Sequence, residues 1–131
     1  MPAYTIEPHV TLPAVIVTWH EDFDFARDAR PQSAAMREVL NNADSPIYYV
    51  MDLTLWSKMP FSDLIEATSI AARGKDANFH NSNNMGTLIV TKDPAVRISA
   101  EGLRSDAFGN ANVLVFSSLD DALAHITEEA A

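Results

Sequence analysis

The sequence contains no cysteine, and its 9 basic residues face 18 acidic ones, for a formal net charge of −9. Without cysteine the chain can form no disulfide, thiol nucleophile or cysteine-ligated zinc site. The shortage of Lys and Arg argues against nucleic acid and anionic membranes, because both bind clustered positive charge. No apolar run approaches the roughly 18 residues of a spanning helix. We therefore expect neither a nucleic-acid partner nor membrane insertion.

Glycine is also scarce, with four residues scattered over the chain. A loop that cradles phosphate needs glycine where the backbone approaches the ligand, and no Gly-rich loop is present. The four histidines share no metal-ligand spacing. The sequence therefore predicts no cofactor and no metal.

The length of 131 residues fits one domain, which we assign to residues 1–131. An apolar fraction of 47% is too high for a disordered chain. The first residues, MPAYTIEPH, lack the basic stretch and apolar core of a signal peptide. We therefore expect a cytoplasmic protein with a substantial hydrophobic core.

The hydrophobic pattern predicts an α/β fold. Apolar, β-branched runs predict strands at residues 4–7, 14–19, 47–53, 87–91 and 113–116. Apolar residues at helical spacing predict helices at residues 31–42, 62–73, 94–108 and from 119 onward. Alternating strands and helices imply right-handed crossovers. We expect a mostly parallel central β-sheet with an N-terminal antiparallel hairpin and about four helices.

Three local features make this order resemble the STAS domains, the family of the anti-sigma-factor antagonists. An apolar strand ends in Asp52-Leu53-Thr54, similar to the Asp-Leu-Ser-like triplet of the family. A helix opens at Phe61-Ser62-Asp63-Leu64, and residues 113–123 resemble the terminal strand, turn and helix of the family. The resemblance covers residues 3–128 as topology and implies a STAS-like fold.

The resemblance also implies a candidate phosphorylation site at Ser62. In STAS domains a partner kinase, which is also the anti-sigma factor, phosphorylates a serine in the loop before this helix. Ser62 takes that position by spacing, within Pro60-Phe61-Ser62-Asp63 in place of Asp-Ser-Ser-Gly. A phosphate there would lie at a helix N-terminus, where backbone N–H groups stabilise it. The alternative is a plain helix cap, a common role of serine. STAS-like relatives that lack the full motif imply a small regulatory or ligand-binding domain.

The loop between the central strand and this helix is unusually rich in large apolar side chains. If exposed, they form a patch that suits a partner or a ligand; otherwise they fold back as a lid on the core. Loops at the carboxyl ends of parallel strands are the usual binding edge of such sheets. We predict a partner or ligand surface made of Trp56, Lys58, Met59, Phe61, Asp63, Phe79 and His80.

Two other groups of residues suggest chemistry. The acidic run from His20 to Asp28 could hold a hard cation, but it lacks the sharp glycine turn of a calcium loop, so a solvated acidic face is the alternative. Asp52 or His80 could serve an enzyme, yet no partner base and no nucleophile elbow is visible. For Asp52 the alternative is a bond to the loop that follows it. We therefore expect no catalytic residues and no enzymatic activity.

These observations favour a non-enzymatic regulatory domain that binds another protein, with Ser62 as a candidate phosphorylation switch. The alternative is a binder of a small apolar ligand or lipid, as in some members of the same architecture. Its cavity would be lined by Trp19, Phe23, Trp56 and Phe79. A homodimer is expected as well, because the strand at residues 4–7 leaves an open sheet edge.

Overall fold

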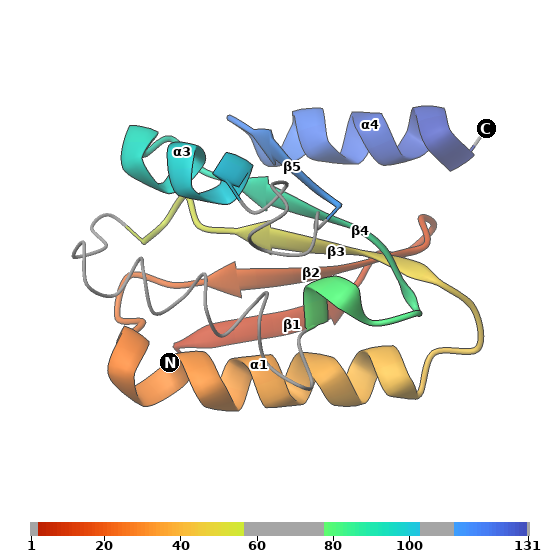
Figure 1. The fold of residues 1–131 in the computed structure, drawn as a ribbon, viewed down its shortest axis with the longest axis horizontal. Helices are drawn as coiled ribbons and strands as arrows, with labels where there is room; N and C mark the ends of the chain where they lie inside the picture. Colours follow the sequence, from red (N-terminus) through yellow and green to blue (C-terminus); the bar gives the residue numbers. More distant parts are fainter. Residues whose placement is uncertain (1–2, 57–77, 103–111, 131) are drawn as a thin grey trace.

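The computed structural model describes residues 3–56, 78–102 and 112–130. Its centre is a five-stranded sheet in the order β1-β2-β3-β4-β5 (Figure 1). β1 pairs antiparallel with β2, and the remaining neighbours are parallel, so the predicted fold class is confirmed. The strands are β1 (Tyr4–Pro8), β2 (Ala14–Trp19), β3 (Ile47–Asp52), β4 (Asn84–Val90) and β5 (Val113–Phe116).

Three α-helices and one short 3-10 helix lie among the described residues. They are α1 (Phe25–Asn41), η1 (Asn78–His80), α3 (Pro94–Gly102) and α4 (Leu119–Ala130). The helix predicted at residues 62–73 lies outside the described residues, as does the predicted continuation of α3 beyond Gly102. Asp93 caps the start of α3, because its Oδ1 accepts a hydrogen bond from the Ala95 amide at 2.9 Å.

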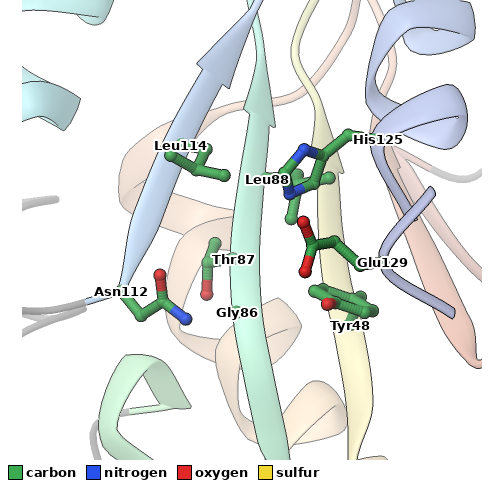
Figure 2. Close-up of a pocket in the computed structure, with 8 residues that line it drawn as sticks. All are labelled: Tyr48, Gly86, Thr87, Leu88, Asn112, Leu114, His125 and Glu129. Atoms are coloured by element: carbon green, nitrogen blue, oxygen red, sulfur yellow. The ribbon is translucent and has the colours of Figure 1, made fainter.

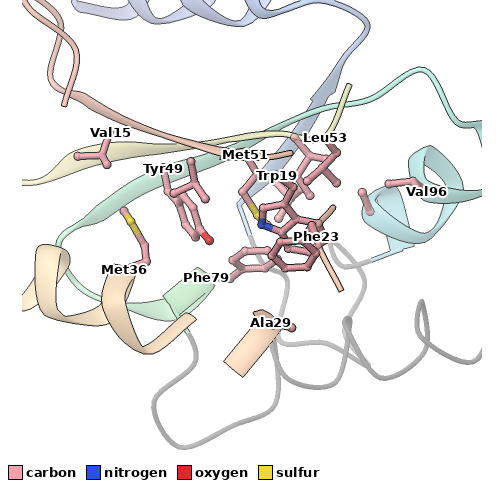
Figure 3. Close-up of a cluster of buried hydrophobic side chains, with 14 of the residues drawn as sticks. Val15, Trp19, Phe23, Ala29, Met36, Tyr49, Met51, Leu53, Phe79 and Val96 are labelled. Carbon is pink, nitrogen blue, oxygen red and sulfur yellow. The ribbon is translucent and has the colours of Figure 1, made fainter. Parts of the chain in front are cut away.

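Two cores lie on opposite faces of the sheet, because alternate strand residues point to opposite sides. Right-handed crossovers that step repeatedly in one direction leave their helices on one face. Accordingly, α1 and α3 share the α1-side core, whose buried residues include Val17, Trp19, Met36, Leu40, Tyr49, Met51, Ile89, Val96 and Ala100 (Figure 3). α4 covers the other face and forms the α4-side core with Ala14, Val50, Leu88, Val90, Ala122 and Ile126.

The start of α1 corrects a prediction. The helix begins at Phe25, well before Pro31, which we expected in its first turn. The Asp24 side chain caps it, since its Oδ1 accepts a hydrogen bond from the Arg27 amide at 3.1 Å. Pro31 lies within the helix on its exposed face. Burial of the inner face of α1 stabilises the helix by more than the loss of the one backbone hydrogen bond that proline cannot donate. The buried residues of this face are Phe25, Ala29, Gln32, Met36 and Leu40.

The Asn-rich stretch before β4 forms turns and backbone hydrogen bonds, as expected for asparagine. Asn78 Nδ2 donates to the Ser33 carbonyl at 2.8 Å, and Asn83 Nδ2 donates to the Leu40 carbonyl at 2.7 Å. These bonds attach the stretch to α1. β4 starts at Asn84, earlier than predicted, and the β3–β4 register shifts between Ile47 and Tyr48. β4 therefore begins at a polar residue, ahead of the apolar run from which its start was predicted.

Candidate functional site

Asp52 ends β3 and fixes the turn that follows. Its side chain is buried, with 9% exposure for the residue. Asp52 Oδ1 accepts hydrogen bonds from the Thr54 amide at 3.0 Å and from the Thr54 hydroxyl at 2.7 Å. This is the local role that the sequence offered as the alternative to catalysis. The carboxylate holds the loop after β3 in place at the carboxyl edge of the parallel strands.

Trp56 folds back onto the core. It is half-buried, and its Nε1 donates a hydrogen bond to the Phe23 carbonyl at 2.9 Å. Its ring centroid lies 4.9 Å from that of Trp19 and 5.5 Å from that of Phe23, edge to face in both cases. Trp19 and Phe23 are themselves stacked, with centroids 4.0 Å apart. The start of this loop, which is the part that the structure describes, therefore folds back as a lid on the α1-side core.

Phe79 also points inward, which corrects its assignment to an exposed surface. It is 8% exposed and lies edge to face against Tyr49, with ring centroids 6.1 Å apart (Figure 3). Its neighbour His80 is exposed at the end of η1 and remains at the surface. The other predicted surface residues and the phosphorylation candidate lie outside the described residues; they are Lys58, Met59, Phe61, Ser62 and Asp63.

Two exposed apolar side chains lie at the edge where the predicted surface was placed. Leu55 follows β3 and is 48% exposed, and Ile98 on α3 is 71% exposed. α3 follows β4, so both segments leave the carboxyl ends of neighbouring parallel strands (Figure 1). The sequence analysis did not single out either residue. Ile98 could have been found, because it lies between the inward-facing Val96 and Ala100 on the helix.

The acidic run before α1 serves to cap that helix. Asp28 Oδ2 accepts a hydrogen bond from the Asp24 amide at 2.9 Å, while the Arg27 guanidinium contacts the Asp28 carboxylate at 2.7 Å. The hydrogen bond from the exposed Arg27 lowers the pKa of the partly covered Asp28 carboxylate. Within the described ranges, no group of three or more His, Asp or Glu residues could hold a metal ion. The arrangement therefore favours the structural interpretation of this cluster.

A buried chain of hydrogen bonds crosses the α1-side core. Trp19 Nε1 donates to Gln32 Oε1 at 3.0 Å, and Gln32 Nε2 donates to the Tyr49 hydroxyl at 3.0 Å. Burial raises the pKa of Tyr49 to about 12, so the phenol stays protonated at neutral pH. The chain joins β2, α1 and β3. Sequence analysis missed Gln32 because a glutamine on a helix is ordinarily exposed.

Comparisons with known proteins identify the fold. An anti-sigma factor antagonist from Mycobacterium paratuberculosis matches with 25% identity and a TM-score of 0.56, over 95% of this chain and 92% of the other. An uncharacterised protein of the DUF3478 family from Shewanella loihica PV-4, with a SpoIIAA-like fold, matches with 12% identity and a TM-score of 0.58, over the same shares. The fold implied by the sequence resemblance is therefore confirmed.

Other comparisons add no family or activity. No family model matches the chain, and no curated protein matches it. Across the described segments, no helix combines the length and apolarity needed to cross a bilayer. Of the two similar structures described above, the anti-sigma factor antagonist has a name that states a function.

Proposed function

We propose that this STAS-like domain is a regulatory protein that acts by binding another protein and catalyses no reaction. The similarity to an anti-sigma factor antagonist over 95% of the chain is the observation that carries this proposal. The chemistry at the carboxyl edge agrees with it. Asp52, the side chain there best suited to catalysis, is occupied with the turn at Thr54.

The proposed contact surface is the carboxyl edge of the parallel strands. Leu55 and Ile98 supply exposed apolar area there. The sequence adds Lys58, Met59, Phe61 and Asp63 to this proposed surface. His80 precedes β4 and therefore lies toward the amino end of that strand, so it is not part of the surface. Exposed apolar side chains beside polar ones are typical of a protein interface. Trp56 supports the surface from below, because its hydrogen bond to Phe23 anchors the start of the loop.

Substitutions at this edge test the surface. Affinity capture from the natural host identifies the partner, and the Kd is then measured with the purified pair. We expect Leu55→Ser and Ile98→Ser each to raise the Kd at least about fivefold, the effect of losing about 1 kcal/mol of contact energy.

Val10→Ser is the matched control for these variants. Val10 is 96% exposed in the β1–β2 loop, at the opposite edge of the sheet. Its substitution removes a similar apolar side chain and should leave the Kd unchanged. Equal Kd values for the control and both edge variants would refute the proposed surface.

Phosphorylation at Ser62 is the proposed switch. A phosphate adds about two negative charges beside Asp63, in a chain that is already acidic. We expect Ser62→Asp to change the partner Kd and Ser62→Ala to preserve the unmodified value. Mass spectrometry of the protein from its own host should find a phosphoryl group on the Ser62 peptide. An unmodified peptide, together with unchanged binding by Ser62→Asp, would reduce Ser62 to a helix cap.

The alternative apolar-ligand site gains no support from the described residues. Trp19, Phe23 and Trp56 pack ring against ring, and Phe79 packs against Tyr49. Because these rings are in direct contact with one another, they leave no apolar cavity between them for a lipid. The described residues therefore favour the protein-binding proposal over the apolar-ligand site.

A further inference from the structure

A hollow of about 190 Å³ lies between α4 and the sheet, at the amino ends of β4 and β5. It is far from the proposed partner surface, which lies at the carboxyl ends of the same strands. Tyr48, Gly86 and Asn112 line it from the sheet side, and His125 and Glu129 line it from α4 (Figure 2).

Gly86 makes the hollow possible. A Cβ atom at this position would lie 3.1 Å from Asn112 Nδ2 and 3.4 Å from Tyr48 Cε1. Any other residue at this position would therefore place side-chain atoms in the part of the hollow that lies between Asn112 and Tyr48. Asn112 is itself held in place, because its Nδ2 donates a hydrogen bond to the Met85 carbonyl at 2.8 Å. The floor and one wall are thus fixed by backbone geometry and a hydrogen bond.

The opposite wall carries the charge. His125 and Glu129 are one helical turn apart on α4, and Figure 2 shows both side chains directed toward the strands. The His125 ring packs against Phe116, with centroids 5.6 Å apart, which orients it. No lysine or arginine stands among the described residues that line the hollow, and Glu129 brings a carboxylate to it. The net charge of −9 adds to the negative potential.

We propose that this hollow binds a small organic cation of the guanidinium type. The Glu129 carboxylate can accept two parallel hydrogen bonds from a planar guanidinium. The Tyr48 ring offers an aromatic face to the same cation. Because Glu129 is acidic and none of the described lining residues is a lysine or arginine, phosphate, carboxylate and other anions are disfavoured. The hollow is too small for a lipid chain and suits a ligand of a few heavy atoms.

The charge of the ligand is tested by titrating the ¹⁵N-labelled protein with methylguanidinium chloride and recording amide shifts. Methylurea is the matched comparison, because it has nearly the same size and shape without the charge. We expect saturable shifts at Gly86, Asn112 and Glu129 with methylguanidinium, and at least tenfold weaker binding of methylurea. Equal binding of the two compounds, or shifts that map elsewhere, would overturn the proposal.

The role of Glu129 is tested with a neighbouring control. Glu129→Gln should raise the methylguanidinium Kd at least about fivefold, because it removes the charge that faces the hollow. Glu128→Gln makes the same change in net charge on the same helix, at an exposed residue that does not line the hollow. It should leave the Kd unchanged. Equal effects of the two variants would mean nonspecific attraction to an acidic protein and would overturn the site.

Gly86→Ala tests the shape of the hollow. The added methyl should abolish binding, and thermal melting shows whether the variant still folds. The Glu129 and Glu128 pair keeps the proposal falsifiable even if Gly86→Ala does not fold, because both substitutions lie on exposed residues of α4. Binding that persists in a folded Gly86→Ala protein would contradict the assigned pocket. None of these outcomes depends on the protein partner at the other edge.

Discussion

At the scale of single residues, the two hydrogen bonds that link Trp19, Gln32 and Tyr49 form a buried polar network inside an apolar core. Gln32 is 2% exposed, so its amide has no access to water. A buried polar group without a partner costs far more than a single hydrogen bond contributes. The network therefore favours one position of α1 over β2 and β3, because a shifted helix would break these buried hydrogen bonds.

Tyr49→Phe should lower the free energy of unfolding by about 1–3 kcal/mol, because it leaves Gln32 Nε2 buried without an acceptor. Urea denaturation at neutral pH measures the change. Tyr48→Phe is the control, since the Tyr48 side chain packs on the α4-side core. It removes the same atom from the adjacent residue and should change stability by less than about 0.5 kcal/mol. Equal losses of unfolding free energy in the two variants would contradict the proposed role of the Trp19–Gln32–Tyr49 hydrogen bonds.

The raised pKa of Tyr49 predicts a weakening of the fold in alkali. An unfolded tyrosine loses its proton near pH 10, whereas Tyr49 in the folded protein keeps it to about 12. Between these values the unfolded state binds fewer protons, so stability falls as pH rises. At about pH 11 the loss should approach 1.4 kcal/mol relative to about pH 9. Urea denaturation of Tyr49→Phe should show a shallower pH dependence, and parallel curves for the two proteins would exclude Tyr49 as the cause.

At the scale of the elements, α4 is the helix that covers the second face of the sheet. It is amphipathic, and its buried residues Ala122 and Ile126 meet Val50, Leu88 and Val90 from the strands. The Ser118 hydroxyl accepts a hydrogen bond from the Asp121 amide at 3.1 Å and so caps the start of the helix. Its place over the sheet also creates the wall of the proposed cation site.

Ile126→Ala should lower the free energy of unfolding by about 2–5 kcal/mol, because the side chain is fully buried and its loss leaves a cavity. Ile98→Ala is the matched control. The same substitution on α3 removes a side chain that is 71% exposed, and its effect should stay within about 0.5 kcal/mol. Thermal or urea unfolding measures both. A large loss in Ile98→Ala would mean that Ile98 is packed rather than available to a partner.

At the scale of the whole molecule, the net charge of −9 governs how the protein responds to salt. Self-repulsion of like charges destabilises a compact state, and added salt screens it. We expect the Tm to rise as NaCl increases from roughly 0.01 to 0.1 M, which shortens the Debye length from about 30 to about 10 Å. Differential scanning calorimetry measures the Tm. A falling Tm would mean that attractive ion pairs, such as Arg27 with Asp28, dominate the electrostatics.

For the molecule as a whole, the strand positions and the type of sheet could be predicted from the sequence. The ranges of β2 and β5 agree with their predictions, and the mixed sheet follows from strands that alternate with helices. These features depend on local apolar periodicity and on short-range chain geometry, which one sequence carries completely. The caps at Asp93 and Ser118 are local in the same sense, because each side chain accepts a hydrogen bond from an amide two or three positions later.

The candidate sites were less predictable. Trp56 and Phe79 were expected at a surface, yet both pack against residues remote in the chain. Trp56 bonds Phe23 across 33 positions, and Asn78 bonds Ser33 across 45. An apolar side chain in a loop suits a lid and a binding patch equally well until its neighbours in space are known.

The sequence by itself therefore determined the fold class, the acidic surface, the absence of thiol chemistry and the local capping of helices. Each of these depends on composition or on residues within a few positions of one another. Only the tertiary structure decided that Trp56 closes over the core and that α1 starts at Phe25 and carries Pro31 on its outer face. It also decided that Gly86 and Glu129 line the same hollow. The physical reason is that burial and pocket shape are properties of side chains brought together from distant parts of the chain.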